Sequence, residues 1–388
     1  MLAGYRTVLK RRGVPRVLLS QLIAHFPSGM ISIVLLILVS DRTGSYAQAG
    51  LVLSALTIGR TINGPLSARA LSVLAVRPTL IVMSALSAGA LLLVALTDLN
   101  VVLTISMGFI YGLFLPPVKQ RARSMYSRLV EKDQRPALYS LDVVGQEIIF
   151  LGGPLLAAGL ANYQPTYAAG LCAVLLVLGS VWFAVVPEQA LLKQEAATRR
   201  TGAVLMNPAV MQGSLIGMAL VGCCFAYEAA AVASFEGQGA LAGAAIAAFA
   251  LGSFIAILLV GQKRGGPWRL TGAMAIVGAG TAAASASDGF IWIAAWLFVA
   301  GFGFAPALSA IFSIIGDFVP EHEAAEAYGW ASSAQLVGAS IGAALAGALI
   351  DSQGPSSAFL LAGGLGILGA VVACAFGLLR PPAPEEAN

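Results

Sequence analysis

The sequence is poor in charge. Only 10% of its 388 residues are Asp, Glu, Lys or Arg, whereas 58% are hydrophobic. Soluble domains carry about 25% charged residues, so this balance excludes an ordinary soluble protein and is typical of a chain that crosses a membrane many times. The apolar segments do not alternate with a period of two, as strands of a membrane barrel would. We therefore expect an all-α integral membrane protein.

Histidine and cysteine are also scarce. The chain has two histidines, His25 and His322, and its four cysteines all fall within apolar segments. Neither set has the spacing of a metal site, a disulfide framework or a catalytic triad. We therefore expect no metal, no cofactor and no enzymatic activity. If the protein transports its substrate actively, we expect a proton gradient to supply the energy.

What the sequence has in abundance is long apolar segments. Windows of about 20 residues, the length of a helix across a bilayer, find twelve. They lie near residues 16–38, 46–68, 78–97, 100–118, 137–160, 165–186, 208–234, 239–261, 268–286, 290–315, 325–350 and 356–379. The one long polar stretch between them, residues 187–207, falls midway. We expect two six-helix bundles, residues 1–186 and 208–388, joined by this linker, with a disordered C-terminal tail.

An internal repeat supports two related halves. Residues about 78–162 are echoed by about 267–351, and rare residue types match at one constant offset of 189: Pro117 with Pro306, Tyr139 with Tyr328, and Gln146 with Gln335. Duplicated helical bundles are the usual architecture of secondary transporters. At this offset Arg60 corresponds to Phe249 and Glu147 corresponds to Leu336. We expect the functional residues at positions such as these, where the two halves carry different residue types.

Basic residues predict the orientation. Of the 22 Lys and Arg residues, 20 fall in the terminal segments, the linker and alternate loops, whereas Arg42 falls on the other side and Arg60 within a span. Positive charge stays on the cytoplasmic side, so both termini should be cytoplasmic. The net charge of +4 then reflects topology rather than nucleic-acid binding. The expected partners are the lipid bilayer and a small-molecule substrate, and we expect a monomer.

The chain resembles the major facilitator superfamily over nearly its whole length, in its twelve spans, 6+6 repeat and central linker. A segment of the fifth span looks like the family's antiporter motif Gly-Pro-x-x-Gly-Gly: Gly152-Gly153-Pro154-Leu155-Leu156-Ala157-Ala158-Gly159. Small residues let helices approach closely, and Pro154 permits a bend. The resemblance implies a bacterial efflux-type subgroup in the inner (cytoplasmic) membrane, with Gly153 and Pro154 taking part in conformational change. Ordinary close packing is the alternative.

Two regions depart from the family's pattern. The loop after the second span lacks the expected aspartate and leaves Arg69 and Arg77 as candidate gating charges, although both would serve equally as topology signals. In the fourth span, Gly108 stands where family antiporters often carry an arginine. If protons are coupled, the charges that carry them should lie elsewhere.

Carboxyl groups inside the spans are the candidates for proton coupling. A charge there costs roughly 2.5–3.5 kcal/mol on insertion scales, so each needs a reason. Glu147 lies near the middle of the fifth span, Glu228 in the outer half of the seventh, and Asp142 nearer the inner end of the fifth. Burial favours the neutral form and allows proton exchange near neutral pH. The alternatives are a static Arg60–Glu147 ion pair and a structural or gating role for Asp142.

The predicted substrate cavity lies between the halves. Spans three, six, nine and twelve hold no charged residue or histidine in their interiors, and in the family these helices face lipid. The other spans supply polar and aromatic candidates: His25, Arg60, Asn63, Tyr111, Gln146, Tyr227, Trp330 and Gln335. Such a set suits an amphiphilic substrate, with packing of the aromatics and a merely hydrogen-bonded histidine as the alternatives.

These observations predict a secondary transporter that moves a small amphiphilic organic molecule by alternating access, with proton-coupled export. An importer or an uncoupled facilitator is the first alternative. A non-transporting membrane receptor or scaffold on the same fold is the second.

Overall fold

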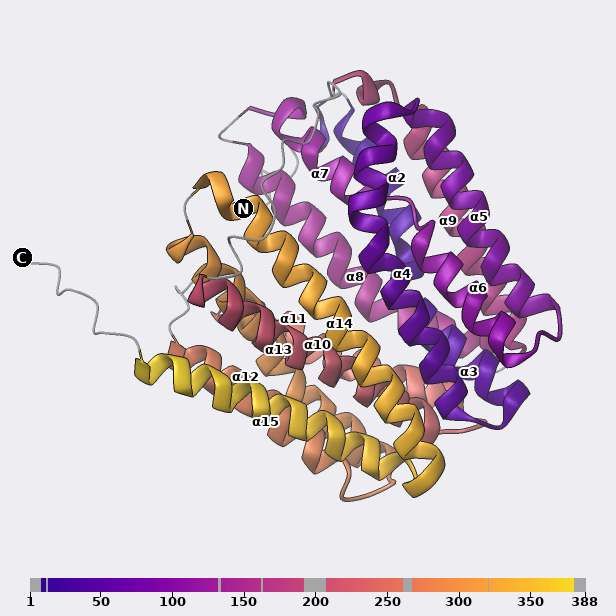
Figure 1. Ribbon diagram of the computed structural model, residues 1–388, viewed down its shortest axis with the longest axis vertical. Coiled ribbons are helices and arrows are strands. Elements are labelled where there is room, and N and C mark those ends of the chain that lie inside the picture. Colours follow the sequence, from indigo (N-terminus) through magenta and orange to yellow (C-terminus); the bar gives the residue numbers. More distant parts are fainter. Residues whose placement is uncertain are drawn as a thin grey trace, which may run out of the picture.

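A computed structural model (Figure 1) describes residues 8–11, 13–131, 134–161, 163–191, 207–260, 267–319 and 321–379. Every regular element in these ranges is helical, which confirms the predicted fold class. The first half holds α2 (Val14–His25), η1 (Phe26–Gly29), α3 (Ile31–Thr43), α4 (Tyr46–Val73), α5 (Val76–Leu96), α6 (Val101–Leu113), α7 (Val118–Leu129), α8 (Arg135–Ala161), α9 (Pro165–Val185) and η2 (Pro187–Leu191). The second half holds α10 (Pro208–Ser234), α11 (Gly239–Val260), α12 (Pro267–Ala284), α13 (Phe290–Phe318), α14 (Glu321–Gln353) and α15 (Pro355–Leu379).

Ten stretches of the described chain are long and apolar enough to cross a membrane. The helices at the second and ninth predicted spans, α4 and α12, exist but are not among the ten. In α4 the helix interior carries Arg60 and Asn63, which lower its hydropathy. Most of the predicted linker, and the C-terminal tail, lie outside the described residues.

Prolines divide two spans that the sequence predicted as continuous. The first span is two helices, α2 and α3, joined by η1, in which Pro27 follows the last residue of α2 by two. The fourth span ends early, because α6 stops at Leu113 before Pro116 and Pro117. Proline has no N–H to donate and disfavours helical backbone in the residue before it.

The basic segment after these prolines is a helix rather than the predicted loop. It forms α7, in which buried residues such as Ala122 and Met125 share one face while Arg128 is exposed. The apolar face gives the segment something to bury, and this favours an amphipathic helix over a loop.

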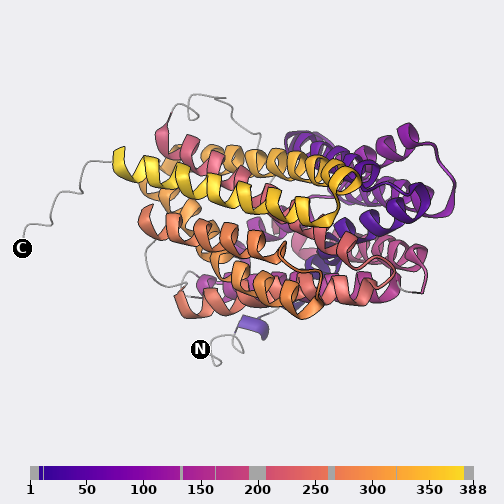
Figure 2. The ribbon, with the colours of Figure 1, turned by 90° about the horizontal axis from the view of Figure 1, so that it is seen from below.

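The two halves form separate groups of helices that meet at one end. Figure 1 shows α2–α9 at the upper right and α10–α15 at the lower left, with α3 and the last turns of α14 coming together at the lower right. Turned by 90°, Figure 2 shows both groups running roughly along one direction. We call the end that carries the chain termini the termini end. The opposite end, with the α3–α4 and α14–α15 connections, is the far end.

Small residues bring the halves into contact near the far end. Gly50 of α4 lies against the backbone of Ala343 in α14, so that an added Cβ would collide with the Ala343 carbonyl oxygen. On the other side of the molecule, a Cβ on Gly243 of α11 would lie 2.7 Å from the carbonyl oxygen of Pro154 in α8. The helix pairs α4–α14, α8–α11 and α3–α10 form the seam between the halves.

The seam is symmetric, and it corrects the register of the repeat. Pro154 corresponds to Ala343 in the repeat at an offset of 189 residues. Gly50 corresponds to Gly243, but at an offset of 193 residues. Inside each half the same shift holds, since Gly112 packs on the backbone N of Arg60 and its mate Gly301 packs on that of Ser253. The structural counterpart of Arg60 is therefore Ser253, and the predicted match with Phe249 was wrong by one helical turn.

Polar groups close the α4–α14 contact. Ser54 Oγ donates to the Ser340 carbonyl oxygen at 2.6 Å, and Ser340 Oγ donates to that of Ser54 at 3.1 Å. At the far end, the Asp351 carboxylate of α14 accepts from the backbone N–H groups of Tyr46 at 2.7 Å and Ala47 at 3.0 Å. It also accepts from Ser45 Oγ at 2.5 Å. One half thus caps the first turn of a helix in the other, where backbone donors have no helical partner.

The hydrogen bonds of Ser54, Ser340 and Asp351 between the halves all lie toward the far end. The far end is therefore closed by direct contacts.

Replacing Asp351 by alanine should loosen the far end. Loss of a helix cap costs about 1 kcal/mol, which shifts the ratio of closed to open molecules about fivefold. Spin labels on Tyr163→Cys and Ser287→Cys, exposed far-end positions in different halves, report the separation. Ser352→Ala is the control, because Ser352 Oγ bonds only its own helix. An unchanged distance distribution in Asp351→Ala would show that the cap does not hold the seam.

Candidate functional site

Asp142 forms the centre of a buried polar cluster at the start of α8. Its carboxylate is fully buried and accepts from Arg123 Nε of α7 at 2.7 Å and from Gln21 Nε2 of α2 at 2.8 Å. Gln146, one turn along α8, contributes a weaker bond at 3.4 Å. The negative charge already has its partners, so the geometry favours the structural role for Asp142 that the sequence left open. Proton transfer at Asp142 stays a prediction.

Arg60 lies in the membrane-spanning part of α4 beside Tyr111 of α6. The two helices approach closely because Gly112 has no side chain to keep them apart. Arg60 Nε and Nη2 and the Tyr111 hydroxyl are buried without a hydrogen-bond partner. Donors left unsatisfied in a membrane protein are costly, and a ligand or water that reaches them gains that energy.

The side chain of Glu147, like that of Arg69, lies outside the described part of the chain. The helices are nevertheless placed. Glu147 belongs to α8, which packs on α11 in the other half, whereas Arg60 belongs to α4, which packs on α14. The two residues therefore come from opposite sides of the first half. This arrangement favours a proton-carrying Glu147 over a close Arg60–Glu147 pair, and both readings stay predictions.

His25 ends α2 just before the break at Pro27. Its Nδ1 lies 3.3 Å from Ser28 Oγ. The positive charges of Lys119, Arg60 and Arg123 act on the ring. The α2–η1 junction thus brings a histidine to the basic residues of α4 and α7, and a substrate role for His25 remains a prediction.

Glu228 lies on α10, where that helix meets α3 at the seam. Ser32 of α3 is its polar neighbour across the seam. The carboxyl oxygen Oε2 is buried and has no hydrogen-bond partner. The titratable groups around it in the described chain are the Cys224 thiol and the Tyr227 hydroxyl of its own helix. Glu228 is therefore a carboxyl group without a cation, placed at a contact between the halves.

The remaining cavity candidates of the second half differ in their surroundings. Tyr227 is buried and stacks on Phe249 with 4.4 Å between ring centroids, and Phe249 in turn meets Phe304 edge-on. This geometry favours packing for Tyr227. Gln335 Nε2 is buried without a partner, and Trp330 is 36% exposed. Substrate contacts at these positions stay predictions.

The predicted motif in α8 makes close contacts on two sides. A Cβ on Gly153 would lie 2.6 Å from the Gly29 carbonyl oxygen in η1, so α8 packs directly on the break in the first span. Pro154 and Ala158 meet Gly243 of the other half. The motif thus lies between the proline break and the seam. Arg77 is exposed at the start of α5, near the termini end.

Several residues of the site were not singled out from the sequence. Gln21 could have been found from the sequence, because a glutamine within an apolar span indicates a buried hydrogen-bonding group. Arg123 was assigned to a loop, and only the helix α7 places it against Asp142. Ser32 gives no signal, because serine is common in membrane helices and only the fold puts it beside Glu228.

Replacing Asp142 by alanine should destabilise the first half by about 1.5–3 kcal/mol, because Gln21 and Arg123 would lose their buried charged acceptor, while Arg123 itself is 42% exposed. The thermal unfolding midpoint of the detergent-purified protein measures this loss. Glu131→Ala is the matched control, since Glu131 pairs with Arg11 at the surface and is 69% exposed. Equal midpoints for the two variants would contradict a structural Asp142.

Comparisons with known proteins place the chain in a family. The family model described as Major Facilitator Superfamily matches residues 17–238 and 228–388. Among solved structures, a mutant of the nucleoside transporter NupG superposes with a TM-score of 0.70 over 92% of this chain and 99% of its own. At 14% identity this likeness shows the fold alone. A search of curated protein sequences finds no match. The chain belongs to the Major Facilitator Superfamily and is a membrane transporter rather than an enzyme.

Proposed function

We propose that the protein moves a small amphiphilic organic molecule across the bacterial inner membrane by alternating access, as a proton-coupled exporter. The observation that carries this proposal is the seam, in which close backbone contacts and hydrogen bonds join the halves at the far end. Two rigid halves joined at one end can rock about a site between them.

The positive charge of the termini end supports its assignment to the cytoplasm. Arg77 and the basic helix α7 lie there, whereas the far end has Arg42 at the end of α3. With that orientation, the conformation is closed to the outside, and both termini and the central linker are cytoplasmic.

The unsatisfied polar groups of the candidate cavity residues support an amphiphilic substrate. Apart from Asn63, these groups belong to Arg60, Tyr111 and Gln146 in the first half and to Gln335 in the second, and the helices that carry them are mostly apolar. A sugar would need many convergent hydrogen-bond partners. A molecule with one polar group and an apolar body needs only a few.

The position of Glu228 supports proton coupling. A closed seam removes water from its carboxyl group, and a buried carboxylate is costly when no positive charge lies beside it, as among the described neighbours of Glu228. Taking up a proton removes that cost, so protonation favours the closed far end and ionisation favours its opening. Glu147 belongs to α8, which also takes part in the seam, and it is the second proposed proton carrier.

The α8 motif supports export as the direction. Pro154 and its neighbours lie where α8 meets α11, so a bend at Pro154 acts directly on the contact that must open. The family associates this motif with exporters, and the geometry gives it a mechanical part in the seam.

The far end should open as pH rises, and Glu228→Gln should abolish this response. The wild-type carboxyl group ionises and destabilises the seam, whereas glutamine mimics the protonated form at every pH. The Tyr163→Cys and Ser287→Cys spin-label pair, measured at about pH 6 and pH 8, reports the separation. Glu236→Gln, an exposed acid near the same end, should behave like the wild type. A pH response that survives in Glu228→Gln would remove Glu228 from the mechanism.

Transport itself can be tested in proteoliposomes that contain a pH-sensitive dye. Addition of amphiphilic aromatic compounds should move protons in the direction opposite to the compound. Glu147→Gln and Glu228→Gln should each lower this flux at least tenfold, and Glu236→Gln should leave it intact. Protons that move with the compound would identify an importer, and compound movement without protons a facilitator. A reconstituted protein that moves none of the compounds would favour a receptor.

A further inference from the structure

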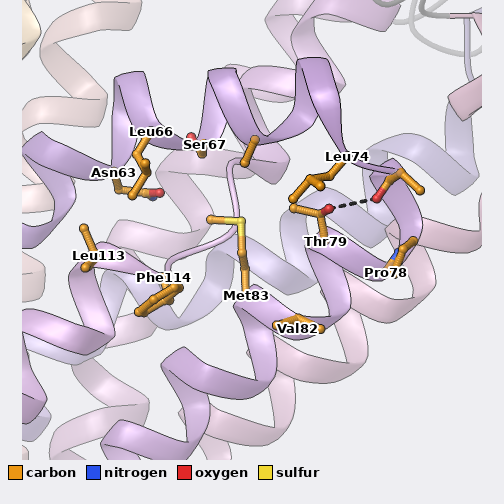
Figure 3. Close-up of a pocket in the computed structure, with 12 residues that line it drawn as sticks. Asn63, Leu66, Ser67, Leu74, Pro78, Thr79, Val82, Met83, Leu113 and Phe114 are labelled. Carbon is orange, nitrogen blue, oxygen red and sulfur yellow. Dashed lines mark hydrogen bonds between the residues drawn. The ribbon is translucent and has the colours of Figure 1, made fainter.

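A cavity of about 460 Å³ lies between α4 and α5, away from the seam (Figure 3). It exists because α6 stops at Leu113 while α4 continues toward the termini end, so nothing fills the wedge between α4 and α5. Its lining includes Asn63, Ser67, Leu74, Thr79, Met83 and Phe114. The volume falls in the range of small-molecule sites, roughly 300–1,000 Å³.

Among the side chains that the structure describes, the polar groups of the cavity walls are already bonded to the backbone, except for the Asn63 amide. Ser67 Oγ donates to the Gly64 carbonyl oxygen at 3.2 Å, and Thr79 Oγ1 donates to that of Ala75 at 2.8 Å. Asn63 Nδ2 donates to the Leu115 carbonyl oxygen at 2.6 Å. These bonds use both hydroxyl donors and one of the two N–H groups of the Asn63 amide.

Asn63 Oδ1 is the unsatisfied atom. It is buried and accepts no hydrogen bond, and the residue as a whole is only 7% exposed. Figure 3 shows the amide end of Asn63 pointing into the cavity. An acceptor left without a donor in an apolar setting costs about 1–3 kcal/mol. A ligand that brings a donor recovers this energy. An ether or ketone can at most accept from the second N–H of the amide, and it leaves Oδ1 unsatisfied.

The cavity opens toward the lipid side of the first half. Val82 and Leu74 at its edge are 55% and 54% exposed, and Val82 shares the exposed face of α5 with Leu86. The principal partners of α5 are α9 and α6, both in the first half. Access from the bilayer selects for apolar molecules, and the cavity does not depend on whether the seam is open.

We propose that this cavity is a binding site for a membrane-dissolved, medium-chain amphiphile that carries one hydroxyl group. The hydroxyl donates to Asn63 Oδ1, and the chain lies between α4 and α5 toward Leu74. The span from Asn63 to Leu74 along α4 is about 16 Å, which accommodates a medium-length chain. A phospholipid acyl chain is the competing occupant, and it has no donor to offer Asn63.

The test uses the full chain in phosphatidylcholine nanodiscs and an octanol that carries a diazirine in its tail. After photolysis, mass spectrometry should place adducts on α4 between Asn63 and Leu74 and on α5 near Met83. Unlabelled 1-octanol should block labelling at a concentration at least tenfold lower than its methyl ether. Asn63→Leu should remove that tenfold difference, and Thr79→Val should keep it, since the Thr79 hydroxyl is already bonded to the backbone.

Equal competition by the ether would overturn the proposal and assign the cavity to acyl chains. Adducts spread evenly over lipid-facing helices, or an undiminished alcohol preference in Asn63→Leu, would also overturn it. If Asn63→Leu does not fold, Val82→Trp tests the site from its rim, because the larger side chain should block labelling. The alcohol–ether comparison on the wild type needs no variant.

Discussion

The contact of glycine with backbone at the seam is the constraint on which the structure depends. Gly50 against Ala343 and Gly243 against Pro154 bring four helices of two halves close enough to exclude side chains between them. In a bilayer there is no hydrophobic force to press helices together, so close van der Waals packing and hydrogen bonds do this work. Ser54, Ser340 and the Asp351 cap add the hydrogen bonds. Because the seam is symmetric, two equivalent bodies can part there by a rigid-body rotation.

The polar residues of the spans divide according to whether the protein itself satisfies them. Asp142 has a cation and two amides, and a group so engaged stabilises the fold. Arg60, Glu228 and Asn63 each keep buried atoms without a hydrogen-bond partner. Unsatisfied buried groups reduce stability, so their presence in a membrane protein indicates a functional role. We have assigned the three to substrate binding, proton coupling and a lipid-side site.

Much of the architecture could be predicted from the sequence because hydropathy and repeat are strong signals. Helix location, the two halves and the small-residue motif in α8 all follow from them. The breaks at Pro27 and Pro116 were not predicted, since a window average passes over single prolines. The register of Arg60 was wrong by four residues, because an offset measured after residue 78 was carried back over a segment that is four residues longer in the first half, from Arg60 to Pro78, than in the second, from Ser253 to Pro267.

The site was harder to predict than the fold. A sequence identifies which polar residues are buried in a membrane but not which of them meet. Arg123 with Asp142, and Ser32 with Glu228, come from segments that only the tertiary structure brings together. Asn63 was expected in the central cavity, yet it lines the wedge between α4 and α5, because the early end of α6 opens a space there.

The central claim is that the two halves rock as bodies about the site between them, so that the far-end seam opens when the termini end closes. Two distances measured in single reconstituted molecules test it most directly, one between Tyr163 and Ser287 at the far end and one between Arg77 and Trp268 at the termini end. All four positions are exposed, and each pair joins different halves. Alternating access predicts that one distance lengthens whenever the other shortens. Distances that change together, or a far end that never opens, would contradict it.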